Sequence, residues 1–440
     1  MGENRWLAAW GLGSIAAGGA SLLVPLYVVN LGAGPGELGV LASMAALAGA
    51  VGALVWGRLA DRMGRWRLLG VASLGGIGLS LATIPVVSGT TLIVALNGLL
   101  WLSFSAATPV FTMLTVNDAN PGERSGRLAH LNRVQGYGWA SGLAIGTVWT
   151  VVSSQIFALP ALASQRLFFG MCAAMAVGSV LAAGVWLPVG GGRTPSNGTT
   201  NRQRNPRPVV ASTFPFLPSQ LYWKVRGLQP QQFVTRFTPA LAAYFFTVAL
   251  FFAGFGIFFA PLPAYLTVVG YSETFIYLFY VVSALGSAVF FGKAGELSAT
   301  RNRRSLQAGA LSIRGTALPA VALVGSGTAF GAGVLALGGI FALIGAAWAV
   351  IALTATEFIS DLAPSVIRGE ALGMYTALSA LAGGLGSLLG GALADTLGYS
   401  LTFTVAGIVV LVSAVFVMKP KLLRVGFGAG QKQEAGSSLD

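Results

Sequence analysis

The sequence predicts an all-helical integral membrane protein with twelve transmembrane helices, arranged as two repeats of six. Hydrophobic residues make up 55% of the chain and charged residues only 9%, whereas a soluble protein carries about a quarter charged residues. The charges occur in clusters, and the uncharged segments between them are long. Because a helix needs about 20 apolar residues to cross a bilayer, each of these segments can hold at least one span.

Six spans are expected before residue 190. Since the apolar run after Arg5 is much longer than that of a secretory signal, the first span is expected to be retained. The turn-forming stretch VSGTT at 87–91 divides the longest uncharged segment into two spans. The uncharged segments of this half are 6–36, 38–57, 68–117, 134–165 and 167–192.

Six more spans are expected after residue 238. The stretch VGSGT at 324–328 makes the corresponding break between spans at about 305–323 and 330–356. The intervening segment contains GGGRTPSNGTTNRQRNPRP and has no apolar periodicity, which is typical of a linker. The expected organisation is a bundle at 1–189, a linker at 190–238, a second bundle at 239–418 and a tail at 419–440.

The basic residues predict the orientation, because Lys and Arg are retained on the cytoplasmic side of short loops. With both termini inside, all Lys and Arg except Arg166 and Arg314 fall in cytoplasmic segments or the first helical turns beside them. The net charge of +13 then requires no nucleic acid, since anionic headgroups would neutralise a basic cytoplasmic face. We expect a multi-pass protein of the plasma membrane.

The composition argues against an enzyme and against a bound cofactor. Cys172 is the only cysteine and His130 the only histidine, so a disulfide framework, a metal cluster or a histidine-dependent catalytic pair is not expected. No nucleotide-binding glycine loop is present, so ATP is not expected to drive the protein.

The two halves repeat one another in the order of their charges and turns. GRLAD at 57–61 corresponds to GKAGE at 292–296, and both lie at the end of the second span of their half. The spacing D-x-x-P-x-x-x-x-G occurs at 118–126 and again at 361–369, while Glu37 and Glu273 each open the second span of a half. Three matches at nearly one offset indicate two six-helix repeats in parallel orientation.

The loop after the second span resembles the signature of the major facilitator superfamily of secondary transporters, roughly G-x-L-a-D-r-x-G-r-k. The matching residues here are Gly57, Leu59, Ala60, Asp61, Arg62, Gly64 and Arg65, and Trp66 replaces a basic residue. The resemblance extends over nearly the whole chain, because the twelve spans, the linker and a degenerate second copy at 292–304 also fit. It implies the fold of that superfamily and a protein that works as a monomer.

The resemblance also implies that Asp61 faces the N-terminal dipole of the eleventh span, near Gly369, and pairs with charges at the end of the fourth. We therefore predict a cytoplasmic latch that closes the inner side in the outward-open state. The alternative is that its arginines only enforce topology. The predicted latch comprises Gly57, Arg58, Asp61, Arg62, Gly64, Arg65, Asp118 and Arg124, with a counterpart of Glu296, Asp361, Arg368 and the arginines at 301, 303 and 304.

By the same resemblance, the substrate cavity would lie between the halves and be built from the first, fourth, seventh and tenth spans. On the fourth span, polar residues recur every three to four positions and so share one face, although small hydroxyls also mediate ordinary helix packing. Aromatic stripes are likewise common in plain packing. The candidates are Asn97, Trp101, Ser105, Thr108 and Thr112, then Tyr244, Phe251, Phe255 and Phe258 on the seventh span, and Tyr27, Asn30, Tyr277, Tyr280 and Trp348.

The coupling ion is not evident, because no carboxylate lies in the middle of any span, which weakens a simple proton-coupled mechanism. Arg314 lies about 15 Å beyond Arg304, deep enough for a role in binding or coupling an anion. The alternative places it nearer the headgroups on a peripheral helix. Arg133, early in the fifth span, is a second candidate for such a role, and a gate or surface position is its alternative.

The function predicted from these features is export of a small amphipathic or drug-like compound by alternating access. One alternative is uniport or exchange of a small organic anion through Arg314 or Arg133. Another is a transport-inactive receptor or scaffold. The antiporter signature of the superfamily is incomplete, since GWASGLAIG at 138–146 carries Leu143 where proline is expected.

Overall fold

The computed structural model describes residues 5–63, 65–117, 124–188, 238–327, 330–364 and 367–419. Within these ranges the regular secondary structure is entirely helical, without strands. A bilayer offers no hydrogen-bond partners for exposed backbone groups, and an apolar helix satisfies its own, so the sequence can only cross as helices.

The first half of the chain forms six long helices. A short 3₁₀ turn, η1, at Ile84–Val86 precedes the predicted break, so the long uncharged segment contains two helices as expected. The helices are α1 (Trp6–Asn30), α2 (Pro35–Met63), α3 (Trp66–Thr83), α4 (Thr90–Asn117), α5 (Arg124–Gln155) and α6 (Ala161–Trp186).

The second half contains six further spans, the first of which is interrupted. The chain turns at Ala260 and Pro261, so the seventh predicted span is made of two helices, α9 and α10. The helices are α9 (Pro239–Phe259), α10 (Leu262–Val268), α11 (Glu273–Thr300), α12 (Arg303–Gly327), α13 (Phe330–Leu362), α14 (Arg368–Leu397) and α15 (Tyr399–Met418).

Eleven helical segments in the described part of the chain are apolar and long enough to cross a membrane. The twelfth long helix, α5, is more polar, because Arg127, His130 and Arg133 lie in its first three turns. It packs closely along α1 and therefore runs through the same bundle. The protein is a multi-pass membrane protein.

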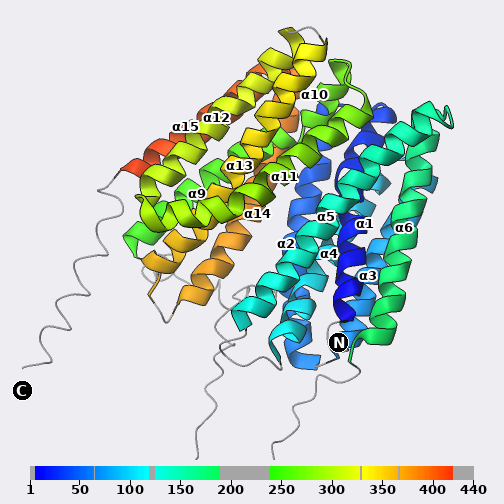
Figure 1. The fold of residues 1–440 in the computed structure, drawn as a ribbon, viewed down its shortest axis with the longest axis horizontal. Coiled ribbons are helices and arrows are strands. Elements are labelled where there is room, and N and C mark those ends of the chain that lie inside the picture. The colour runs from blue at the N-terminus through cyan, green and yellow to red at the C-terminus, as the bar shows by residue number, and fades with distance from the viewer. Residues whose placement is uncertain are drawn as a thin grey trace, which may run out of the picture.

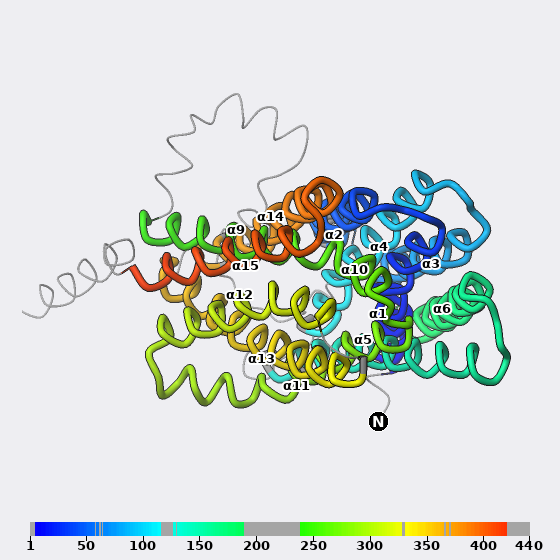
Figure 2. Tube along the Cα trace, turned by 90° about the horizontal axis from the view of Figure 1, so that it is seen from above, coloured from blue at the N-terminus to red at the C-terminus, as the bar shows by residue number. Residues whose placement is uncertain are grey.

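The helices form two groups that lie side by side and diverge toward one end (Figure 1). Helices α1–α6 form one group and α9–α15 the other, and Figure 2 shows both groups from above. We call the end that carries Trp6, Met418 and the arginine-rich turns the basic end, and the other end the opposite end. The two groups meet mainly through α2 with α14 and α5 with α11.

Candidate functional site

A cavity of about 900 Å³ lies between the two groups of helices. It extends along α14 to Leu372, about one turn from the start of that helix at the basic end. No described residue that lines it is charged. The wall combines aliphatic and small side chains with four aromatic residues, Trp101, Trp139, Phe259 and Tyr280, and with the hydroxyls of Ser21, Ser105, Thr108, Thr112, Thr376 and Ser387.

The predicted polar face of α4 lines this cavity over its whole length. All five candidates, Asn97, Trp101, Ser105, Thr108 and Thr112, lie on the wall. Asn97 also serves packing, since its Nδ2 donates to the carbonyl oxygen of Leu41 on α2 at 3.2 Å. The Trp101 ring packs against Trp139 of α5, with their centroids 5.7 Å apart.

Most of the predicted aromatic residues of the second half lie away from the cavity. The phenol oxygen of Tyr244 is buried and accepts a hydrogen bond of 2.6 Å from Nε2 of Gln307 on α12. Phe251, Phe255 and Phe258 are buried among aromatic neighbours. Of the second-half candidates, only Tyr280 is on the wall.

The tenth span, α13, contributes no described residue to the wall, contrary to the expectation from the resemblance. Its candidate Trp348 instead packs on Phe252 and Phe255 of α9, with centroids 6.0 and 6.2 Å apart. The tryptophan fills the space between α9 and α13, so it stabilises that group rather than facing the cavity.

Three other candidates lie toward the opposite end. The Tyr27 ring is buried, and Nε of Arg166 donates to its oxygen at 3.4 Å. Tyr277 is buried against Phe168 of α6, and its hydroxyl has no partner among the described residues. Asn30 bonds across the two groups. None of the three lines the cavity.

Sequence reasoning missed the two helices that contribute most of the small side chains to the wall. On α2 these are Ala42, Ala45, Ala46, Gly49, Ala50 and Ala53, and on α14 they are Gly373, Thr376, Ala377 and Ala380. Both sets recur at three to four positions and so mark one helical face. This stripe of small residues was the available signal, although the same stripe is also typical of tight helix packing in membranes.

A half-buried carboxylate joins the two groups at the opposite end. Oε1 of Glu273, the first residue of α11, accepts hydrogen bonds from Nδ2 of Asn30 at 2.7 Å and Nε2 of Gln165 at 2.8 Å. Next to it, the hydroxyl of Thr274 donates to that of Thr150 at 3.0 Å. Since Glu273 belongs to one group while Asn30 and Gln165 belong to the other, these hydrogen bonds to a carboxylate link the two groups at this end.

Helices α2 and α14 touch through their backbones at the same end. A Cβ on Gly391 would lie 2.6 Å from the Pro35 carbonyl oxygen, 2.9 Å from Cα of Gly39 and 3.0 Å from Cα of Gly36. Only glycine permits this approach. Nearer the basic end, the same two helices are separated by the cavity, since Leu54 and Leu372 are both on its wall.

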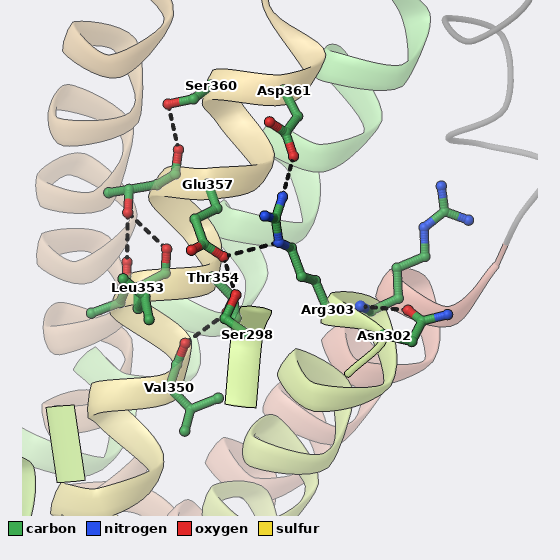
Figure 3. A network of polar contacts seen from close by, with 12 residues as sticks. Ser298, Asn302, Arg303, Val350, Leu353, Thr354, Glu357, Ser360 and Asp361 are labelled. Carbon is green, nitrogen blue, oxygen red and sulfur yellow. Dashed lines mark hydrogen bonds and ion pairs between the residues drawn. The ribbon is translucent and has the colours of Figure 1, made fainter. Parts of the chain in front are cut away.

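At the basic end of the second group, an ion-pair network connects α12 with α13 (Figure 3). Arg303 contacts Glu357 at 3.3 Å and Asp361 at 2.6 Å, and the hydroxyl of Ser298 donates to Glu357. The network is internal to one group. It joins two members of the predicted latch counterpart, Arg303 and Asp361, but it does not connect the two groups.

Much of the predicted latch of the first half lies outside what the structure describes, namely the side chains of Arg58, Asp61, Arg62 and Arg124 and the residues Gly64 and Asp118. Gly57 is buried and faces Pro109 of α4. Arg65, Glu296 and Arg368 are exposed at the basic end. No ion pair between the two groups occurs there among the described residues.

Arg314 is buried inside the second group. Its Cζ lies 4.0 Å from the ring centroid of Phe255 and 5.3 Å from those of Phe259 and Trp348. Its one hydrogen bond is long, 3.4 Å to the Ile344 carbonyl oxygen, and its Nε has no partner among the described residues. Arg133, in contrast, is exposed and off the cavity wall.

The comparisons with known proteins agree with this architecture. A family model described as Major Facilitator Superfamily matches residues 7–365. No curated protein matches the chain.

Several solved structures share the fold. One is a mutant form of the nucleoside transporter NupG, with a TM-score of 0.72 and 13% identity over 95% of this chain and 99% of that one. Another is a bacterial homolog of the human lysosomal transporter Spinster in an inward-facing and unoccupied conformation. Its TM-score is 0.67 and its identity is 13%, over 94% of this chain and 95% of that one. The human organic anion transporter MFSD10 has a TM-score of 0.59 and 16% identity, over 94% of this chain and 98% of that one. Since the family model spans most of the chain and the helices have the matching arrangement, this membrane transport protein belongs to the major facilitator superfamily.

Proposed function

We propose that the protein is a secondary transporter that exports a small amphipathic organic compound by alternating access, with the structure representing its inward-open state. The basic end would face the cytoplasm, because short cytoplasmic loops retain Lys and Arg. The contacts through Glu273 and Gly391 then close the outer side, and the cavity between the groups is open to the inner side.

The observation that carries this proposal is the uncharged lining of the 900 Å³ cavity. Such a wall offers aromatic faces and a few hydroxyls, which suits a ligand with a large apolar surface and few polar groups. A strongly charged or highly hydroxylated solute would lose its hydration there without gaining partners. Lipophilic compounds that accumulate in the cytoplasm fit these requirements.

A second candidate substrate is a small organic anion, and the surroundings of Arg314 favour it. Phe259 lies both on the cavity wall and beside the guanidinium. Phe255 and Trp348 also pack on the guanidinium, so a rearrangement of this aromatic cluster would open a path from the cavity to a cation that has no carboxylate partner among the described residues. The similarity in fold to MFSD10, described as an organic anion transporter, makes anions a class to include in assays.

Three further features belong to the proposal. The transporter functions as a monomer in the plasma membrane, and both of its termini are cytoplasmic. Coupling to a proton or another ion is left to measurement, because the cavity wall holds no described carboxylate. A transport-inactive receptor is the competing interpretation, and it predicts binding without movement of solute.

Counterflow in proteoliposomes tests these proposals. Vesicles with purified protein would be screened with amphipathic cations, organic anions and nucleosides, the last because NupG is a nucleoside transporter. Ala377→Trp, which fills the cavity, should abolish uptake, whereas Leu385→Trp on the exposed face of the same helix should retain it. Uptake that is equal in both variants would exclude this cavity as the route, and specific binding without counterflow would favour a receptor.

A further inference from the structure

The eight-residue pattern that identifies the loop after α2 occurs a second time, at the far end of α14. Residues 57–64 read GRLADRMG, and residues 391–398 read GALADTLG. Both copies have the form G-x-L-A-D-x-x-G, and both fall at the C-terminal end of a helix. In the second copy Gly398 ends the helix with a φ of 79°, a conformation that favours glycine.

The two copies lie at opposite ends of one helix pair. Helix α2 runs from the opposite end to the basic end, α14 runs the other way, and the two pack against each other across the boundary between the groups. The first copy and the start of α14 are therefore both at the basic end, where the cavity separates the two helices. The second copy is at the opposite end, beside the start of α2.

In the structure, the aspartate of the second copy contacts the first turn of α2. Oδ2 of Asp395 occupies the space into which a side chain at Gly36 would project, and Oδ1 approaches Gly34. Among the described residues Asp395 makes no hydrogen bond, so its contact with α2 is one of charge and shape. The nearest acidic residue on that turn, Glu37, accepts a hydrogen bond of 3.1 Å from the Gly34 N–H, within its own group.

This contact should be attractive. The first N–H groups of a helix have no acceptor within the helix, and with the helix dipole they give its N-terminus a partial positive charge. The Asp395 carboxylate of one group thus lies against the positive end of a helix from the other group. Because Asp395 is exposed, the attraction is moderate and weakened by salt.

We propose that residues 391–398 form an outer latch, which holds the two groups together at the opposite end through Asp395 and the N-terminus of α2. The inference rests on the proposed alternating-access function. Gly391 and Gly36 allow the close approach of the two helices, and Asp395 supplies the charge. The latch is closed in the inward-open state seen here, and it breaks when α14 moves away from α2.

The antiparallel arrangement makes the device reciprocal. The reciprocal contact, between Asp61 of the first copy and the start of α14 when the groups rock to close the basic end, is the one that the family resemblance implies. One helix pair thus carries a latch for each state. Loss of Asp395 favours the outward-open state, and loss of Asp61 favours the state observed here.

Distances between spin labels test the proposal in protein reconstituted in lipid nanodiscs. In a Cys172→Ser background, one pair of cysteines at Ser88 and Ser326 reports on the opposite end, and a pair at Gly126 and Ala299 reports on the basic end. Asp395→Asn should increase the ratio of outward-open to inward-open molecules about two- to fivefold, as expected for a charge at a helix N-terminus. Asp61→Asn should decrease that ratio, and the double variant should return toward the unmodified protein.

The matched control is Ser400→Ala, which changes an exposed residue just outside residues 391–398 and should leave both distances unchanged. Gly36→Ala, which displaces the carboxylate, should act like Asp395→Asn, whereas Asp395→Glu should retain part of the effect. Distances in Asp395→Asn that equal those of the control would overturn the latch. Since no substrate is needed, a failure of transport in vesicles leaves this result interpretable, and the converse also holds.

Discussion

Replacement of Gly391 by alanine should displace the equilibrium between the two states. The added methyl group would meet three backbone atoms, the Pro35 carbonyl oxygen at 2.6 Å and the Cα atoms of Gly39 and Gly36 at 2.9 and 3.0 Å. Backbone atoms cannot rotate away as the end of a side chain can, so α2 and α14 must separate at the opposite end. In the proposed alternating-access cycle this contact exists only while the outer end is closed, so the penalty falls on the inward-open state.

Overpacking of a well-packed contact costs about 1–3 kcal/mol. Because about 1.4 kcal/mol corresponds to a tenfold change in an equilibrium constant, the outward-open population should rise between about fivefold and about 150-fold relative to the inward-open one. Alanine also favours helix over glycine by up to about 1 kcal/mol, but this gain is the same in both states and does not shift the ratio.

The assay is the same pair of spin-label distances, at Ser88 with Ser326 and at Gly126 with Ala299. The control is Gly383→Ala on the same helix, where the nearest atom to a new Cβ is the Phe252 carbonyl oxygen at 3.9 Å. The two variants should unfold at similar temperatures yet differ in their distances. Identical distance distributions for them would refute the idea that the glycine contact sets the closed outer side.

Three further predictions concern side chains packed between the helices. Glu273→Ala should leave Asn30 and Gln165 without their acceptor and weaken the closed outer end by about 2 kcal/mol. Glu273→Gln should retain part of the contact. The spin-label distances measure the effect of both variants. Arg314→Met should leave the thermal unfolding temperature unchanged or raised, because a buried cation without a carboxylate partner among the described residues gives way to an apolar side chain of similar length. A loss of several degrees would contradict this. Native Cys172 is buried, so maleimide should not label it in the folded protein. Fast labelling would contradict the buried position of this thiol.

The sequence alone predicted the spans and the breaks between them, because the bilayer imposes one rule on every crossing segment. The helices begin and end close to the charged clusters, and the turn around residues 87–89 separates α3 from α4 as VSGTT indicated. The polar face of α4 was also predictable, since Asn97 and the hydroxyl residues after it contrast with an otherwise apolar helix and so mark the side turned toward the cavity.

Only the tertiary structure showed which of the apolar helix faces line the cavity. In a membrane, a face turned to lipid and a face packed in the protein are both apolar, so periodicity does not distinguish them. This is why Trp348 and Phe255 were expected on the wall but lie behind it, and why the small residues of α2 were overlooked. The same reason applies to Glu273, whose partners come from α1 and α6, and to Asp395, whose partner is the start of α2. In the sequence, Glu273 and Asp395 are only two charges at helix ends. The packing of one group of helices against the other brings each of them to its partners across the boundary.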